Sequence, residues 1–230
     1  MKIFVINGSP KTEKSNTIKL ANAFVDGLNK AGEITIEKIN IYDKKIEPCR
    51  GCFGCWKITP GKCVISDDMD DLYVKYFDAD LIIWSFPLYY YGMPSQVKAF
   101  ADRLMPNNYP EIINDNGRAR HPLRHNREKQ NHVLISTCGF FTVKNNYDAL
   151  IKQYEIMFAD RFVKILCPQG ELFNIPQLSD LTGKYLSNVT EAGREYAELG
   201  HFSEKTEQNL NEPLLQAEQF VEMANMYWKR

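Results

Sequence analysis

The sequence predicts an α/β protein built on a doubly wound parallel sheet of five strands. Short apolar runs recur along the chain, and each alternates with a segment of helical periodicity. Strands that alternate with helices favour a parallel sheet with right-handed crossovers. Five strands of this length suit the order 2-1-3-4-5, in which a ligand binds beyond the carboxyl ends of the strands, where the strand order reverses.

The individual elements follow from local patterns. Residues 3–6 are a buried apolar run, whereas residues 34–39 alternate as an edge strand does. Asp67 and Asp68 have the chemistry of an N-cap and first helical turn. The expected strands are 3–6, 34–39, 81–84, 132–136 and 162–166. The expected helices are about 15–30, a segment opening at 67–68, 95 to about 104, and about 147–158.

We expect a single domain over residues 1–230, with a core of about 1–168 and a helical C-terminal extension of about 169–230. The extension has two helical patterns, and the last, from about Glu212 to Trp228, is amphipathic. The segment from Pro106 to Gln130 is long for a connection and is therefore functional or mobile. Its arginines either meet the phosphates of a nucleotide or lie in solvent, and solvation is favoured. These arginines are Arg118, Arg120, Arg124 and Arg127.

The composition limits the partners and the compartment. The 230 residues include 28 Lys and Arg against 29 Asp and Glu, which gives no electrostatic reason to expect nucleic acid or an anionic membrane. No apolar run reaches membrane length, and the N-terminus lacks a basic lead or cleavage site. We therefore expect a cytoplasmic protein whose six cysteines are thiols or metal ligands.

The segment between Ile6 and Thr17 has the features of a phosphate site. Gly8 and Pro10 end the first strand, and a run of capping residues then opens the first helix. The helix N-terminus offers free N–H groups and the positive end of the helix dipole. The candidate side chains here are Ser9, Ser15, Asn16 and Thr17, with Lys11 in the same loop. The alternative is an ordinary turn whose serines only cap the helix.

Two further loops should reach the same edge of the sheet. Residues 85–94 follow the third strand and are rich in tyrosine and proline, and residues 137–141 follow the fourth strand and contain a glycine. Beside a phosphate site, this arrangement suits a ligand with a phosphate at one end and a flat ring at the other. The alternative for each tyrosine is packing in the core.

Several motifs occur in a shared order over residues 1–165: Asn-Gly-Ser-Pro with Ser-Asn-Thr, Cys-x2-Cys-x2-Cys, Gly-Lys-Cys-x3-Asp-Asp-Met and Ser-x-Pro-Leu-Tyr. With these motifs the chain resembles the flavodoxin-like NAD(P)H-dependent FMN reductases, in the branch that includes the iron–sulfur flavoproteins. The resemblance implies a flavodoxin-like fold, a bound FMN, NADH or NADPH as electron donor, and a homodimer or tetramer. It also implies a small acceptor such as a quinone, a nitro compound or a flavin. The chemistry would belong to the FMN, and no catalytic side chain is assigned.

The same resemblance assigns the three loops. The first would bind the FMN phosphate, the second would lie against the isoalloxazine ring, and the third would follow its other edge. The residues in the second and third loops are Pro87, Leu88, Tyr89 and Tyr90, then Thr137, Cys138 and Gly139.

Four cysteines lie close together in sequence, at Cys49, Cys52, Cys55 and Cys63. Their thiolates are enough to hold a [4Fe–4S] cluster, and zinc would also accept four sulfurs. Bare thiols in a packed loop are the favoured alternative, since free cysteine behaves as a small apolar residue. A cluster would make the chain an electron carrier rather than a turnover enzyme. A flavin-binding regulatory module is a third hypothesis, with no positive support in the sequence.

Overall fold

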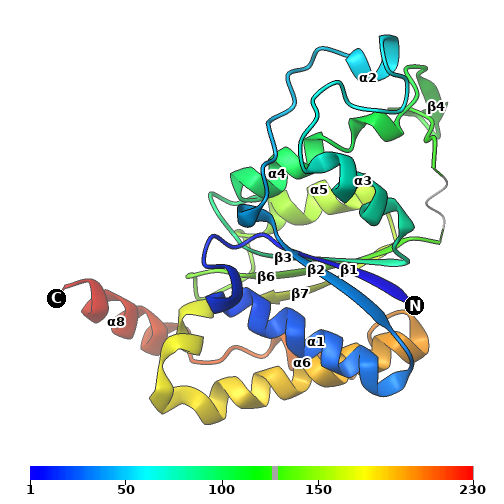
Figure 1. The fold of residues 1–230 in the computed structure, drawn as a ribbon. Coiled ribbons are helices and arrows are strands. Elements are labelled where there is room, and N and C mark those ends of the chain that lie inside the picture. The colour runs from blue at the N-terminus through cyan, green and yellow to red at the C-terminus, as the bar shows by residue number, and fades with distance from the viewer. Residues whose placement is uncertain (126–128, 230) are drawn as a thin grey trace.

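A five-stranded parallel sheet forms the centre of the molecule (Figure 1). The computed structural model describes residues 1–125 and 129–229. The strand order is β2-β1-β3-β6-β7, which confirms the predicted 2-1-3-4-5 arrangement of the sheet strands. The strands are β1 (Lys2–Asn7), β2 (Thr35–Asn40), β3 (Leu81–Pro87), β6 (Asn131–Thr137) and β7 (Phe162–Cys167).

The register aligns the carboxyl ends of the central strands. Asn7 at the end of β1 lies opposite Asn40 on one side and Ser85 on the other. Thr137 at the end of β6 lies opposite Pro87 and Cys167. The loops that follow β1, β3 and β6 therefore leave the sheet at one edge, as expected where the strand order reverses.

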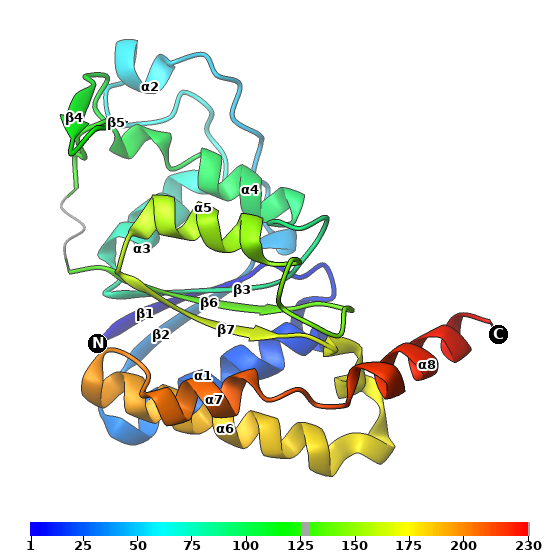
Figure 2. The same ribbon diagram turned by 180° about the vertical axis from the view of Figure 1, so that it is seen from behind.

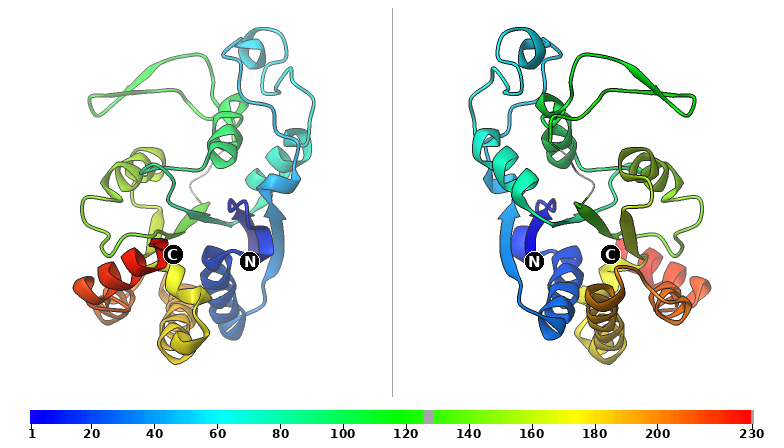
Figure 3. Two further views of the ribbon diagram at one scale, coloured as in Figure 1. Left: turned by 90° about the vertical axis from the view of Figure 1, so that its left-hand side faces the viewer. Right: turned by 90° about the vertical axis from the view of Figure 1, so that its right-hand side faces the viewer.

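Helices cover both faces of the sheet, so that three layers are visible in the edge-on views (Figure 3). One face carries α3 (Met69–Asp78), α4 (Ser95–Asp102) and α5 (Asp148–Phe158). Its core contains the fully buried rings of Trp84 and Tyr76. The other face carries α1 (Asn16–Ala31) and α6 (Ser179–Leu199), packed over a core that includes Phe24.

The long helix α6 lies directly against α1. A Cβ atom on Gly27 would come within 2.0 Å of the Thr190 carbonyl oxygen, and one on Gly193 within 2.1 Å of the Phe24 carbonyl oxygen. Two glycines thus allow the helix backbones to touch. As a result, α6 completes the second helical layer even though it belongs to the C-terminal segment.

Two more helices, α7 (Glu204–Asn211) and α8 (Ala217–Trp228), follow α6 (Figure 2). The prediction that the last helix begins at about Glu212 is wrong, since α8 begins at Ala217. The backbone N–H and carbonyl of Leu215 are hydrogen-bonded to the Gln169 side chain, and this keeps the preceding residues out of the helix. Figures 1 and 2 show α8 projecting away from the body of the molecule. Phe220 is buried, whereas Met226 and Tyr227 are exposed.

The sequence patterns did not predict a small antiparallel hairpin of β4 (Ile113–Asp115) and β5 (Arg118–Arg120). It lies with the short helix α2 (Gly54–Lys57) at one end of the molecule, beyond α4 (Figure 1). The remaining short helical turns are Thr12–Lys14, Ile41–Asp43, Met105–Asn107, Gly170–Asn174 and Pro176–Leu178.

Among the helices of the described part of the chain, none combines the length and the apolar character needed to cross a membrane.

Candidate functional site

The loop after β1 places buried hydroxyl groups at the start of α1. Ser15 is the N-cap of this helix, and its Oγ accepts a hydrogen bond from the Thr17 N–H at 3.2 Å. Ser9 Oγ accepts from the Lys11 N–H at 3.3 Å, and both serines are nearly inaccessible to solvent. The capping alternative is therefore realised at Ser15, while the first turn of α1 still presents backbone donors suited to an anion.

Gly8 holds this loop against the neighbouring elements. Its N–H donates to the Ser85 carbonyl oxygen at 2.7 Å, and a Cβ atom in its place would lie 2.2 Å from Val97 Cγ2. Only glycine permits so close an approach. The loop after β1 is therefore fixed beside the end of β3 and the start of α4.

The first and third loops meet at a pair of threonines. The hydroxyl oxygens of Thr17 and Thr137 are 2.6 Å apart and buried. Asn16 Nδ2 donates to the Gly170 carbonyl oxygen at 2.8 Å, and no partner for its buried Oδ1 is found among the described residues. The structure thus brings the start of α1 and the end of β6 into direct contact, as predicted for a shared site.

The loop after β3 contains a strained turn. Leu88 N–H donates to the Thr137 carbonyl oxygen at 2.8 Å, and Tyr89 and Gly92 exchange backbone hydrogen bonds of 3.2 and 3.0 Å. The two residues between them, Tyr90 and Tyr91, have φ of 48° and 64°. Left-handed backbone at a side chain this large costs about 1–2 kcal/mol per residue, and such strain is typical of functional loops.

This turn presents aromatic rings toward solvent. Tyr90 is 98% exposed, and the rings of Tyr91 and Phe140 are stacked with an interplanar angle of 11° and centroids 6.0 Å apart. Burial raises the pKa of Tyr89, and the neighbouring Tyr42 and Glu171 add to this effect. The tyrosine rings of this turn are exposed and so do not pack in the core. Leu88, which precedes them, is buried.

The third loop combines buried and open positions. Cys138 is buried, and its N–H donates to the Cys167 carbonyl oxygen at 3.2 Å. Burial raises the pKa of the Cys138 thiol. A Cβ atom on Gly139 would meet nothing within 4 Å. Gly139 is therefore open to solvent on this side.

The loop after β7 belongs to the same edge of the sheet, and the sequence patterns did not predict this. Gln169 N–H and Gly170 N–H donate to the carbonyl oxygens of Phe140 and Cys138, both at 2.8 Å. The buried Gln169 amide exchanges two further 2.8 Å hydrogen bonds with the backbone of Leu215. The chain leading into α8 is thus fastened beside the third loop.

The four loop cysteines lie apart from this edge. Cys49 and Cys52 are exposed, Cys63 is partly covered and Cys55 is buried. Burial raises the pKa of the Cys55 thiol, and the nearby Cys63, Cys49 and Cys52 add to this effect. Phe53 and His121 each contact the ring of Trp56, with centroids 5.1 and 5.0 Å away. The loop is thus packed against the segment that carries the hairpin.

Three of the four arginines in the long connection between Pro106 and Gln130 have local partners. Arg120 pairs with Asp115 at 2.6 Å, Arg118 Nη2 donates to the Ile156 carbonyl oxygen at 2.7 Å, and Arg124 lies 4.1 Å from the ring centroid of Tyr109. Arg127 lies outside the described residues. These interactions occur away from the three loops and favour solvation or local structure over nucleotide binding.

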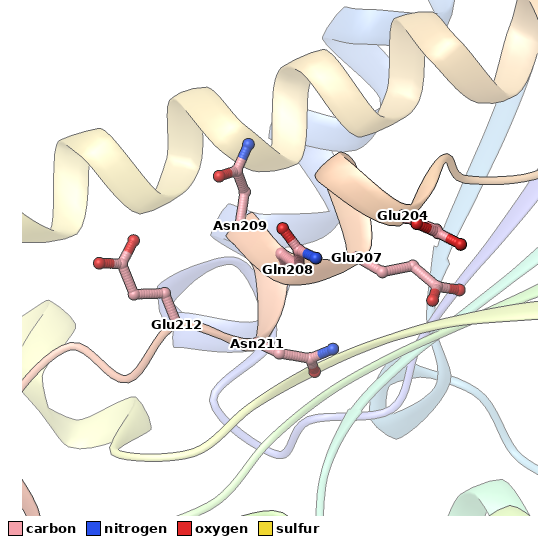
Figure 4. A pocket seen from close by; sticks show the side chains of 6 residues that line it. All are labelled: Glu204, Glu207, Gln208, Asn209, Asn211 and Glu212. Atoms are coloured by element: carbon pink, nitrogen blue, oxygen red, sulfur yellow. The ribbon is translucent and has the colours of Figure 1, made fainter.

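A hollow of about 580 Å³ on the outer surface is lined by α7 and the residue that follows it (Figure 4). Its side chains point in different directions rather than toward a common point. They are Glu204, Glu207, Gln208, Asn209, Asn211 and Glu212. All of these residues come from α7 and the residue after it, and their acidic and amide groups do not converge on one point, so the hollow is not a candidate site.

Comparison with known proteins shows the family to which the chain belongs. A family model described as "Flavodoxin-like fold" matches residues 1–165, which is well over half of the chain. The chain is a member of this flavodoxin-like family. Within the flavodoxin-like chain, all three loops at the sheet edge fall in the matched region.

The flavodoxin-like chain is also similar to individual proteins. An iron–sulfur flavoprotein of Archaeoglobus fulgidus is 38% identical over 106 residues, covering 46% of this chain and 46% of the relative. The chain thus spans about half the length of the curated relatives it matches.

Solved structures share the fold over most of the chain. An FMN-dependent NADH-azoreductase of Bacillus anthracis, in complex with FMN, has a TM-score of 0.61 at 18% identity and covers 86% of this chain and 97% of its own. An NAD(P)H:quinone oxidoreductase of Methanothermobacter marburgensis has a TM-score of 0.63 at 17% identity, with 88% and 98% covered. At this identity the likeness establishes the fold alone.

The residues at the sheet edge fit FMN. A helix N-terminus with buried hydroxyls suits the phosphate, exposed rings suit a flat ring system, and the open position at Gly139 leaves room. For the cysteines, no three metal-binding side chains among the described residues are arranged around one ion. Four cysteine sulfurs from one loop are a donor set for a [4Fe–4S] cluster and also for zinc, and bare thiols in a packed loop are the third alternative.

Proposed function

We propose that the chain is an FMN-dependent oxidoreductase that takes electrons from NADH or NADPH and passes them to a small acceptor. The acceptor would be a quinone, a nitro compound or a flavin. One observation carries the proposal: the hydroxyl oxygens of Thr17 and Thr137 are 2.6 Å apart. This contact joins the N-terminus of α1, where a phosphate would bind, to the loop after β6, which lies beside the exposed aromatic turn. Both ends of an FMN molecule therefore have suitable surroundings at one edge of the sheet.

Each loop has a role in this proposal. Ser9, Ser15 and Thr17, with the first backbone N–H groups of α1, would hold the phosphate, and Lys11 and Asn16 stand beside them. Bound FMN would supply the hydride-accepting and electron-transferring chemistry. The chain contributes orientation, because buried hydroxyls and fixed backbone donors hold a charged group with little reorganisation.

The second and third loops would border the ring. The Leu88 N–H donates to the Thr137 carbonyl oxygen and Pro87 lies opposite Thr137 in the sheet, while Tyr89 and Tyr90 are exposed. The open position at Gly139 leaves one side free for the nicotinamide and then the acceptor. The roles of these residues and of Cys138 are part of the proposal.

Comparison of FMN with riboflavin tests the phosphate site directly. Riboflavin has the same ring but no phosphate. Loss of two or more charge-assisted hydrogen bonds of about 1.5–3 kcal/mol each lowers affinity by about 100-fold or more. Titration of the flavin-free chain, followed by flavin fluorescence, measures both dissociation constants. Equal affinity for the two flavins would show that the phosphate does not bind at α1.

A second function, electron transfer through a [4Fe–4S] cluster, is favoured by the cysteine loop. Burial first, and then the nearby Cys63, Cys49 and Cys52, raise the pKa of Cys55, so each of these three cysteines lies near Cys55. Four cysteine sulfurs are the ligands that such a cluster requires. Anaerobic purification with iron and flavin analysis tests this: about four irons per chain and faster reduction by ferredoxin than by NAD(P)H support it. A yellow, iron-free protein that NAD(P)H reduces excludes it.

We also propose that the chain acts in the cytoplasm as a homodimer or tetramer. The projecting helix α8 supports this assembly, since Val221 and Met226 on it are exposed.

A further inference from the structure

The cysteine loop, residues 47–65, begins and ends at one buried ion pair. Arg103 follows α4, Asp67 precedes α3, and both side chains are only 1% exposed. The Asp67 carboxylate accepts from Arg103 Nη1 at 2.8 Å and from Nη2 at 3.0 Å. This two-point geometry is the strong form of the interaction, and it lies outside the flavin loops.

The same two side chains hold the backbone at both ends of the loop. Arg103 Nη1 donates to the Glu47 carbonyl oxygen at 2.7 Å, and Nη2 donates to the Ile65 carbonyl oxygen at 3.0 Å. The Glu47 N–H in turn donates to Asp67 at 2.9 Å. Without these bonds, closing a loop of this length would carry an uncompensated entropic cost.

Cys63 lies beside this pair. It lines a cavity of about 310 Å³ together with Arg103, Met69 and Tyr73. The Arg103 guanidinium, paired with Asp67, therefore lies next to the last cysteine of the loop.

We propose that the Arg103–Asp67 pair is a positioning clasp that closes the cysteine loop at both stems and keeps Cys55 and Cys63 on its protected side. The clasp is also connected to the aromatic loop after β3. Helix α4 begins after that loop, has eight residues and a length of about 12 Å, and ends directly before Arg103. The inference goes beyond the proposed flavin function and does not depend on it.

Thiol alkylation of the full, metal-free chain tests the clasp. The double variant Arg103→Met with Asp67→Leu removes both charges, and so avoids an unpaired buried charge that would threaten folding. We expect iodoacetamide to modify Cys55 and Cys63 at least about tenfold faster in this variant, as mapped by mass spectrometry. Cys49, already exposed, should react at an unchanged rate.

Three controls separate positioning from general stability. Cys138 and Cys167 are buried at the sheet and report on the whole fold. The proposal is wrong if the alkylation rates of Cys138 and Cys167 rise together with those of Cys55 and Cys63, or if no cysteine reacts faster in the double variant. Lys98→Met removes an exposed ion pair on the same helix and should change no rate. Arg103→Lys keeps the charge without the forked donors and should behave as the double variant does; full protection with lysine overturns the proposal.

Discussion

At the scale of single residues, the hydroxyl groups of Ser15 and Thr17 are the most direct probes of the phosphate site. Both are buried at the first turn of α1. We expect Ser15→Ala and Thr17→Ala each to weaken FMN binding by roughly tenfold to a hundredfold, because each removes a hydrogen bond to a charged group worth about 1.5–3 kcal/mol. Fluorescence titration of the flavin-free variants gives the dissociation constants.

Ser187→Ala is the matched control, since this exposed hydroxyl on α6 donates only to the Gly183 carbonyl oxygen of its own helix. Its FMN affinity should equal that of the unmodified chain. If both α1 variants also retain full affinity, the phosphate does not lie at these hydroxyls.

The buried polar residues differ in how well the sequence reveals them. The role of Ser9, Ser15 and Thr17 at a phosphate stays a prediction, but their place at the start of α1 was predictable because capping residues after a strand are a local pattern. The Gln169 amide and the Arg103–Asp67 pair were not, because their partners lie 46 and 36 residues away in sequence and only the folded chain brings them together.

At the scale of elements, the turn at Tyr90 and Tyr91 combines strain with exposure. Both residues have left-handed backbone, which asparagine and glycine adopt readily. Tyr90→Asn with Tyr91→Gly should therefore raise the free energy of unfolding by about 1–2 kcal/mol, which is less than the sum for two strained residues because glycine has more freedom in the unfolded chain. The same change removes the ring stacked on Phe140 and should weaken FMN binding or its reduction. Urea unfolding and flavin titration measure the two effects; a variant that is less stable than the parent contradicts the strain argument.

The α1–α6 contact gives a second test at this scale. Gly27→Ala places a Cβ atom 2.0 Å from the Thr190 carbonyl oxygen and should lower the free energy of unfolding by about 3 kcal/mol or more. Gly183→Ala, also in a helix, meets nothing within 4 Å and should be neutral or stabilising by up to about 1 kcal/mol. Equal effects of the two changes in urea unfolding would mean that α6 does not pack tightly on α1.

Some elements were predictable from the sequence and others were not, for physical reasons. The five sheet strands are apolar or alternating runs, so periodicity located each of them. The β4–β5 hairpin consists of two three-residue polar strands, Ile113–Asp115 and Arg118–Arg120, and carries no such signal. The start of α8 depends on the bonds between Gln169 and Leu215 rather than on helical periodicity.

At the scale of the whole molecule, α8 bears on assembly. It leaves the body next to the loop after β7 and exposes Val221 and Met226. We expect a homodimer at micromolar concentration, and removal of residues 217–230 should yield a monomer that keeps its fold. Light scattering with circular dichroism checks both; a monomeric full-length chain, with or without FMN, contradicts the prediction.

We propose that this chain binds FMN at the carboxyl edge of the sheet and reduces it with a nicotinamide nucleotide. The most direct measurement is the visible absorbance of the FMN-loaded chain under anaerobic conditions as NADH or NADPH is added. We expect the flavin absorbance at visible wavelengths to be lost with one of the two donors and to return when a quinone is supplied. A chain that takes up no FMN, or whose bound FMN stays oxidised with both donors, would contradict it.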